Sequence, residues 1–218
     1  MCGIIANLTQ EESKQYQAVV ESADCHRMRG PDSRTIILNR TGLFLFDRLK
    51  INDLSMSGNQ PFTDRHERDG EVHDLLLMCN GEIFNHTELE RDYNLVPKSK
   101  SDCECIMLLY KKLGMELTYN ALNGDFAFVL VDENLTTKQV TYYFARDITG
   151  VRPLFYADTI VSSTVNPLIK MGLQPEEVLP GYLYTNFCPE DKLVRHGMTL
   201  SPSFDDQCAS IRTILEKA

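Results

Sequence analysis

The chain begins Met1-Cys2-Gly3-Ile4-Ile5-Ala6-Asn7-Leu8, and this stretch decides the fold. Residues 3–8 are mostly apolar or β-branched, which is typical of a buried strand. Once Met1 is removed, Cys2 carries a thiol and a free α-amine on adjacent carbons, so the amine can accept the thiol proton directly or through one water. An α-amine titrates near ~7.7–8.0 and a thiol near ~8.5, so part of each is reactive at neutral pH. The stretch therefore predicts an amino-terminal nucleophile, the alternative being a cysteine that follows Met1 by chance.

The 218 residues are 43% hydrophobic and 24% charged, as in an ordinary globular domain with one large core. No apolar run approaches the ~20 residues that span a bilayer, and the first residues lack a secretion leader, so we expect no membrane partner. A net charge of −9 without a basic block argues against nucleic acid as a partner. Seven irregularly spaced cysteines fit a reducing compartment, so we expect a cytoplasmic protein.

Hydrophobic periodicity predicts strands at residues 3–8, 35–40, 42–49, 72–78, 126–131, 139–145, 153–156, 182–187 and 192–195. It predicts helices at residues 11–27, 101–114, 165–171 and 205–218. Ser101 and Glu104 form a capping box at the start of the second helix. Residues 52–70, rich in Asn, Ser, Gly, Pro and charges, are expected to form a long loop. Strands with two buried faces and helices in two groups predict two packed sheets flanked by helices.

Asn80-Gly81 follows a predicted strand that is apolar on both faces. The glycine lets the backbone approach a ligand closely. The side-chain amide of Asn80 and the backbone N–H of Gly81 are two donors that can converge on one developing oxyanion. The alternative is a plain Asn-Gly turn.

Two charged residues complete the candidate set. Asp102 is expected in the first turn of a helix, where the helix dipole favours a carboxylate that can hold an ammonium group; it can instead serve only its own helix. Arg48 ends an apolar strand, and its planar guanidinium suits bidentate binding of a carboxylate, the alternative being a surface ion pair. With Cys2 and the oxyanion donors, these residues describe a site for a free amino acid with a reactive side-chain carbonyl, and glutamine fits.

A series of motifs in one order resembles a known family. Over residues 2–187 the chain closely resembles the class II (N-terminal nucleophile) glutamine amidotransferase domain of glutamine-hydrolysing asparagine synthetase. The motifs are Cys2-Gly3-Ile4, Arg29-Gly30-Pro31-Asp32, Arg48-Leu49, Gln60-Pro61, Asn80-Gly81-Glu82-Ile83-Phe84-Asn85, Ser101-Asp102-Cys103-Glu104, Gly124-Asp125-Phe126-Ala127-Phe128 and Ala145-Arg146-Asp147-Ile148-Thr149-Gly150-Val151-Arg152-Pro153-Leu154.

The resemblance implies an α+β fold, a four-layer αββα sandwich of two mostly antiparallel sheets (the N-terminal nucleophile hydrolase fold). It implies that mature Cys2 attacks the side-chain amide of L-glutamine, forms a γ-glutamyl thioester and releases ammonia, after which water frees glutamate. By the same resemblance Arg48 binds the substrate α-carboxylate and Asp102 the α-amino group, with Glu82 close by. Asn80 and Gly81 form the oxyanion hole.

Three positions depart from the family pattern. Met28 stands where a histidine usually precedes Arg-Gly-Pro-Asp, which removes an expected support near the glutamine pocket. Lys100 replaces the common glycine before Ser-Asp and is expected to narrow or charge the pocket rim. Ser163-Thr164 replaces a Ser-Glu pair in a region that faces the partner domain in relatives.

The resemblance also sets the expected domains and partners. Residues 2–200 are expected to form a type-2 glutamine amidotransferase domain, and residues 201–218 a linker or the start of a missing synthetase domain. The chain has no Gly-rich phosphate loop, so ATP and Mg²⁺ are expected only with the missing synthetase domain or subunit that accepts the ammonia. A homo-oligomer stays open.

We expect no cofactor and no metal in this chain. Cys103 and Cys105 point apart on a helix, and Cys25-His26 has no second pair at ligand spacing. Two other functions stay open: a degenerate, non-catalytic binding domain, and a stand-alone amidotransferase that serves another acceptor enzyme.

Overall fold

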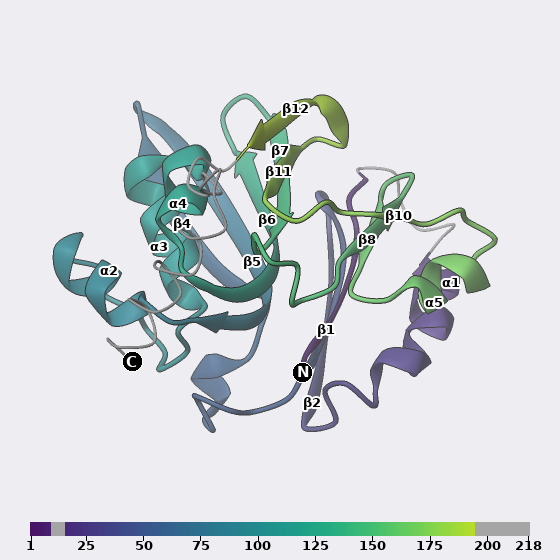
Figure 1. Cartoon of the computed structure of the whole chain (residues 1–218). Coiled ribbons are helices and arrows are strands. Elements are labelled where there is room, and N and C mark those ends of the chain that lie inside the picture. Colours follow the sequence, from purple (N-terminus) through teal and green to yellow (C-terminus); the bar gives the residue numbers. More distant parts are fainter. Residues whose placement is uncertain (10–15, 195–218) are drawn as a thin grey trace, which may run out of the picture.

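Two six-stranded sheets pack against each other in a computed structural model, which describes residues 1–9 and 16–194 (Figure 1). The first sheet has the order β10-β8-β9-β1-β3-β2 and the second β12-β11-β7-β6-β5-β4. The paired strands are antiparallel throughout. The first sheet consists of β1 (Gly3–Asn7), β2 (Ser33–Asn39), β3 (Gly42–Arg48), β8 (Phe155–Ala157), β9 (Ile160–Ser162) and β10 (Glu176–Glu177). The second consists of β4 (Phe62–Arg68), β5 (Glu71–Ile83), β6 (Gly124–Asn134), β7 (Val140–Arg146), β11 (Tyr182–Thr185) and β12 (Cys188–Val194).

Helices cover the outer face of each sheet, which confirms the predicted αββα sandwich (Figure 1). The helices on the first sheet are α1 (Tyr16–Ser22), continued by a 3₁₀ turn (Ala23–His26), and α5 (Val165–Lys170). Beside the second sheet lie α2 (His86–Asp92), α3 (Glu104–Leu113) and α4 (Met115–Ala121), and a 3₁₀ turn (Met56–Gly58) lies in the loop after β3. Within the described residues, no helix has the length and apolar character to cross a bilayer.

Alternation of side chains along the strands divides the core into three parts. On β1, Ile4 and Ala6 face the second sheet, whereas Ile5 faces the helices of the first sheet. On β5, Leu76 faces the first sheet and Leu77 faces α3 and α4. Both sheets are therefore buried on two faces, as the apolar runs of the sequence predicted.

The predicted loop at residues 52–70 is wrong in its second half, because Phe62–Arg68 forms β4. Among the described strands it lies at the edge of the second sheet and pairs with β5 alone. Its Thr63, Arg65 and Glu67 side chains are exposed, and charged residues are common on edge strands. Such a strand lacks the apolar alternation by which a half-buried strand is recognised, so composition alone indicated a loop.

The Asn80-Gly81 pair lies inside a strand rather than after one, which corrects the predicted end of that strand at residue 78. Strand β5 continues to Ile83 and pairs with β6, with Gly81 opposite Phe126. A Cβ atom on Gly81 would lie 2.0 Å from the carbonyl oxygen of Asp125. Only glycine therefore lets the two strands approach this closely.

The helices also differ from those predicted from the sequence. The capping box is wrong, because Glu104 accepts hydrogen bonds from the backbone of Lys98 and Ser99 at 2.9 and 2.8 Å, and α3 begins only at Glu104. Helices α2 and α4 were not predicted. Of the helix predicted at 11–27, residues 16–22 are α-helical; residues 10–15, the helix predicted at 205–218 and the expected linker 201–218 lie outside the described residues.

Gly81→Ala should destabilise the fold strongly, because the new methyl group would meet backbone rather than a movable side chain. We expect a loss of about 3 kcal/mol or more in the free energy of unfolding. Gly70→Ala is the control, in the turn that joins β4 to β5: its φ is +79°, but no atom lies within 4 Å of the added Cβ, so we expect a loss of about 1–2 kcal/mol. Chemical denaturation measures both; equal losses would contradict the close approach at Gly81.

Candidate active site

Cys2 lies directly before β1, the strand held between β3 and β9 in the first sheet. Its Sγ accepts a hydrogen bond from the backbone N–H of Leu49 at 3.4 Å and lies 3.7 Å from the carbonyl oxygen of Leu49. Arg29 donates from Nε to the carbonyl oxygen of Cys2 at 3.0 Å. The thiol is therefore fixed by the end of β3 and by the Arg-Gly-Pro-Asp turn.

Asn80 supplies a buried donor that the protein leaves without a partner. The residue is 1% exposed, and its Nδ2 has no hydrogen-bond partner among the described residues. A buried polar group of this kind is uncommon and is often functional. The neighbouring Gly81 also lines the pocket, and its carbonyl oxygen accepts a weak hydrogen bond from Cys103 Sγ at 3.5 Å.

Arg48, at the end of β3, is 5% exposed and is held rigidly by the following loop. Its Nη1 donates to the carbonyl oxygen of Ser55 at 2.8 Å and to Asn59 Oδ1 at 2.6 Å, and its Nη2 donates to the carbonyl oxygen of Asp53. A guanidinium has more donors than these three acceptors use. Arg48 is therefore positioned by the protein, and its guanidinium, which lines the pocket, has N–H groups beyond these three bonds.

Asp102 lies in the segment that leads into α3 and is 4% exposed. Its Oδ1 accepts from Asn52 Nδ2 at 2.7 Å and its Oδ2 from the backbone N–H of Ile83 at 2.6 Å. These bonds orient the carboxylate, and no lysine or arginine is hydrogen-bonded to it among the described residues. Glu82, partly buried on β5, lines the same pocket.

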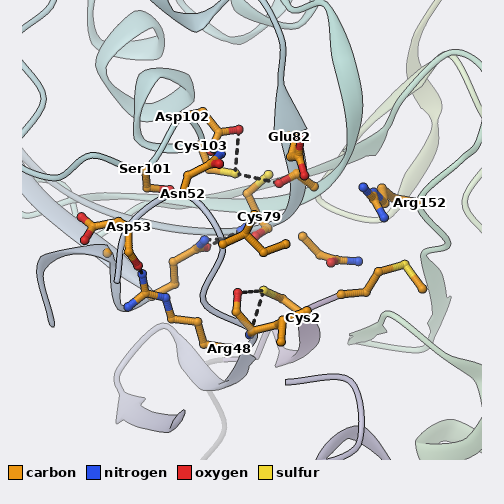
Figure 2. A pocket seen from close by; sticks show the side chains of 17 residues that line it. Cys2, Arg48, Asn52, Asp53, Cys79, Glu82, Ser101, Asp102, Cys103 and Arg152 are labelled. Atoms are coloured by element: carbon orange, nitrogen blue, oxygen red, sulfur yellow. Dashed lines mark hydrogen bonds between the residues drawn. The ribbon is translucent and has the colours of Figure 1, made fainter. Parts of the chain in front are cut away.

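All six residues predicted from the sequence line one pocket. Figure 2 shows Cys2 and Arg48, from the first sheet, on one side, and Glu82 and Asp102 on the other. The pocket volume is about 60 Å³. Met1 forms part of the wall, so removing it enlarges the pocket.

The site also contains residues to which the sequence gave no role. Asn52 orients Asp102, Asn59 contacts Arg48, and Arg152 lines the pocket. Gln60 exchanges two hydrogen bonds with the backbone of Cys79, at 2.6 and 3.1 Å, and so connects the loop after β3 to β5. Gln60 and Arg152 lie in two of the family motifs, so the sequence could have indicated a role for them. Asn52 and Asn59 lie in none of these motifs.

None of the three departures lines the pocket. Met28 is 89% exposed. The side chain of Lys100 is also exposed, and only its backbone N–H takes part, donating to Asp53 Oδ2 at 2.9 Å. The side chain of Lys100 therefore does not narrow the pocket as expected, and the charge that it adds near the rim stays a prediction.

His26 and the Ser163-Thr164 pair hold the backbone next to Cys2 in place. His26 is fully buried, and its Nε2 lies 2.7 Å from Thr164 Oγ1. A Cβ on Gly3 would lie 3.1 Å from His26 Nδ1, so the imidazole packs directly against the backbone next to Cys2. Ser163 bonds both to the N–H of Ile4, through Oγ at 3.0 Å, and to its carbonyl oxygen, through N at 2.9 Å.

A cysteine at the head of a central strand of an αββα sandwich defines the N-terminal nucleophile class of amidotransferase domain. The profile of the family described as "Glutamine amidotransferase domain" matches residues 1–203, and the chain belongs to that family. This confirms the resemblance found in the sequence.

Several known proteins are similar to the chain. Over 196 residues it is 35% identical to "Amidase chyE" of Penicillium rubens, covering 81% of this chain and 27% of that protein. It is 34% identical to an asparagine synthetase (glutamine-hydrolysing) of Pongo abelii, covering 84% of this chain and 33% of the relative. An asparagine synthetase (glutamine-hydrolysing) of Bacillus subtilis is also 34% identical, over 72% of this chain and 20% of the relative.

A solved structure, that of the allosteric regulatory enzyme of purine biosynthesis, shares the fold with a TM-score of 0.56. The sequences are 18% identical, and the match covers 84% of this chain and 40% of the other. The chain thus spans a third or less of the length of the three curated relatives above.

The burial of His26 makes the stability depend on pH. Burial, with the positive charges of Arg29 and Arg34, lowers the pKa of His26 to about 3. The unfolded chain protonates this residue near pH ~6.5, so below that pH the unfolded state binds more protons than the folded state. The contribution of His26 therefore lowers the free energy of unfolding as the pH falls from about 6.5 toward about 3, by up to about 1.4 kcal/mol per pH unit.

His26→Gln should flatten this dependence, since glutamine does not titrate. We expect urea unfolding between about pH 7 and pH 5 to give a shallower slope of unfolding free energy against pH for the variant. Carboxylates contribute to both slopes alike, so the difference isolates His26. Parallel lines for the two proteins would show that His26 is not a buried neutral imidazole.

Proposed function

We propose that the chain is a glutaminase of the asparagine synthetase type, which hydrolyses L-glutamine to glutamate and ammonia through a Cys2 γ-glutamyl thioester. One observation carries the proposal: the thiol of Cys2 and the unpartnered amide of Asn80 line the same pocket, between a positioned guanidinium and a positioned carboxylate. Arg48 and Asp102 would hold the α-carboxylate and α-ammonium of the substrate. Membership of the glutamine amidotransferase domain family supports this choice of substrate.

The thiol needs a base. Burial raises the pKa of Cys2, although the hydrogen bond from Leu49 opposes the shift, so the thiol is protonated at neutral pH. The proposed base is the α-amine that Cys2 gains when Met1 is removed. Met1 is 49% exposed, which leaves it open to an aminopeptidase.

The surroundings favour a neutral amine at this place. Partial burial, and then the positive charges of Arg29 and Arg152, lower the pKa of the present terminal amine on Met1. Cys2 is the next residue along the chain. We therefore expect the α-amine that it gains when Met1 is removed to have a lowered pKa as well. A neutral amine can accept the thiol proton, and as an ammonium it can return that proton to the leaving group.

The chemistry then follows from the placed groups. The Cys2 thiolate attacks the side-chain carbonyl carbon of glutamine, and the negative charge moves to the carbonyl oxygen, where Asn80 Nδ2 and the Gly81 N–H stabilise it. Collapse of this intermediate breaks the C–N bond, and the amine of Cys2 protonates the departing nitrogen as ammonia. Water, deprotonated by the same amine, hydrolyses the thioester to glutamate and the free thiol.

The ammonia is proposed to pass to an ATP-dependent synthetase domain or subunit that makes asparagine. Two observations support this acceptor. The Glu82-Ile83-Phe84-Asn85 segment after Asn80-Gly81 resembles the asparagine synthetase branch of the family, and several relatives are named asparagine synthetase. Relatives named amidase have similar identities, so another acceptor is the competing outcome. Catalysis requires a free Cys2 thiol, which is consistent with the reducing compartment expected from the sequence.

Cys2→Ala should abolish glutamate and ammonia release while leaving the fold intact, because it removes the attacking atom. The wild-type chain, once intact mass confirms that it has lost Met1, should release the two products in equal amounts without ATP or Mg²⁺. Activity that persists in Cys2→Ala, or a processed wild type that binds glutamine without turnover, would contradict the proposal; the second result would favour the degenerate binding domain.

Asn80→Ala tests the oxyanion hole. Loss of one such donor lowers kcat by about 100- to 1000-fold, while KM changes little because the charged ends of the substrate keep their partners. Asn120→Ala is the control: Asn120 also has a buried side-chain atom without a partner, at Oδ1, but lies outside the pocket, so its kcat should be retained. Equal losses of kcat in the two variants would contradict the proposal that Asn80 stabilises the oxyanion.

A further inference from the structure

A second cluster of ligand-type side chains lies on the second sheet, away from the glutamine pocket. It consists of His66 on β4, His73 on β5 and Asp132 on β6, three adjacent strands. His73 lies seven residues before Asn80 on β5, which places the cluster about 23 Å along the strand from the oxyanion donors at ~3.3 Å per residue. None of the three residues lines the glutamine pocket.

Strand register brings these side chains together. His66 and His73 are directly opposite on β4 and β5. Asp132 is opposite Leu75, two residues from His73, so it lies on the same face as the two histidines. This is the face that packs against α3. We expected no metal from the sequence because we compared pairs that are close along the chain, whereas these residues meet only through strand pairing.

The distances are close to those of a metal site. One ligand-type atom from each residue lies within 4.8 Å of the other two, and His73 Nδ1 is 2.6 Å from Asp132 Oδ1. Nitrogen and oxygen ligands around a tetrahedral Zn²⁺ lie about 3.3 Å from one another, given metal bonds of ~2.0–2.2 Å. Small side-chain rotations therefore suffice to place an ion between the three groups.

His66 provides a separate reason to expect a ligand. Its Nε2 is buried and has no hydrogen-bond partner within the described part of the chain. A buried ring nitrogen without a partner is costly, and a bound ion would satisfy it. The rings of His66 and His73 lie 5.4 Å apart, centroid to centroid, so His73 does not satisfy this nitrogen.

The surroundings provide both orientation and access. Tyr110 donates its hydroxyl to Asp132 Oδ2 at 2.5 Å, and Arg68 Nη2 reaches the same oxygen at 3.3 Å, so the carboxylate is held in place. A polar hollow of about 260 Å³, lined by His73, Asp132 and Glu71 among others, opens beside the cluster. It offers an ion a route in and room for a water as a further ligand. The positive charge of Arg68 opposes a cation and should limit its affinity.

We propose that His66, His73 and Asp132 form a binding site for a divalent transition metal ion of the zinc class. The ion joins β4, β5 and β6 across the edge of the second sheet and takes no part in glutamine chemistry. Imidazole and carboxylate ligands suit this class of ion better than Ca²⁺ or Mg²⁺. Because the ion binds the folded chain, it raises the unfolding temperature.

The test uses Zn²⁺ and the full chain with its thiols reduced. After equilibrium dialysis, the wild type should retain one more zinc per chain than His66→Asn, and affinity at this site should fall at least about tenfold in the variant. His86→Asn is the matched control, since His86 is a surface residue that pairs with Glu90, and it should behave as the wild type. Arg68→Gln should bind Zn²⁺ several-fold more tightly, because a nearby positive charge is removed.

Two further readouts complete the test, and the first needs no variant. Co²⁺ added to the wild type should give visible d–d bands without the sulfur charge-transfer band that cysteine ligation produces. His66→Asn should keep full glutaminase activity, so failure of the metal site and failure of the proposed function are distinguishable. Equal zinc content in the wild type and His66→Asn, or a cobalt spectrum of thiolate ligation only, would overturn the proposal and leave the cluster as a structural hydrogen-bond network.

Discussion

The hydrogen bonds that hold β1 on both sides are the constraint on which the candidate site depends. Strand β1 pairs with β3 and β9, and Ser163 fixes both the N–H and the carbonyl oxygen of Ile4. Without these hydrogen bonds, Met1 and Cys2 would form a free chain end. A nucleophile misplaced by about 1 Å can lose about 100-fold in rate. Gly3 contributes to the same placement of Cys2, because the buried ring of His26 lies against the position that a side chain at residue 3 would occupy.

The pocket exists only where the two sheets meet. The first sheet contributes the thiol and the guanidinium, and the second contributes Asn80, Gly81 and Glu82. Packing of the inner faces fixes the sheets relative to one another, so groups remote in sequence are pre-organised without a bound ligand. The unpartnered amide of Asn80 costs stability in the free protein, and in the proposed reaction it is satisfied only when charge develops on the substrate.

The fold class and the six pocket residues could be predicted from the sequence because the motifs occur in one order, although Cys2, Asn80-Gly81, Asp102 and Arg48 each kept an alternative when taken alone and Glu82 came only with the resemblance. The apolar runs around Ile4 and Leu77 show burial on two faces, and the motif order carries the family. Predictions from the sequence were wrong where contacts between residues distant in the chain, rather than local composition, determine the structure. Strand β4 has the composition of a loop, and the sequence placed Gly81 after the end of its strand, although this glycine lies inside β5 where two strands approach closely. Asn52, Asn59 and the His66–His73–Asp132 cluster depend on register and loop packing, which one sequence does not display.

The central claim is that a processed amino-terminal thiol becomes acylated by glutamine. Rapid acid quench of the processed chain during turnover, followed by peptide mass spectrometry, measures this directly. The account predicts one glutamyl group on the peptide that begins with Cys2, lost on treatment with hydroxylamine. Steady turnover with no adduct on that peptide at any quench time, or with a glutamyl group on another residue, would contradict it.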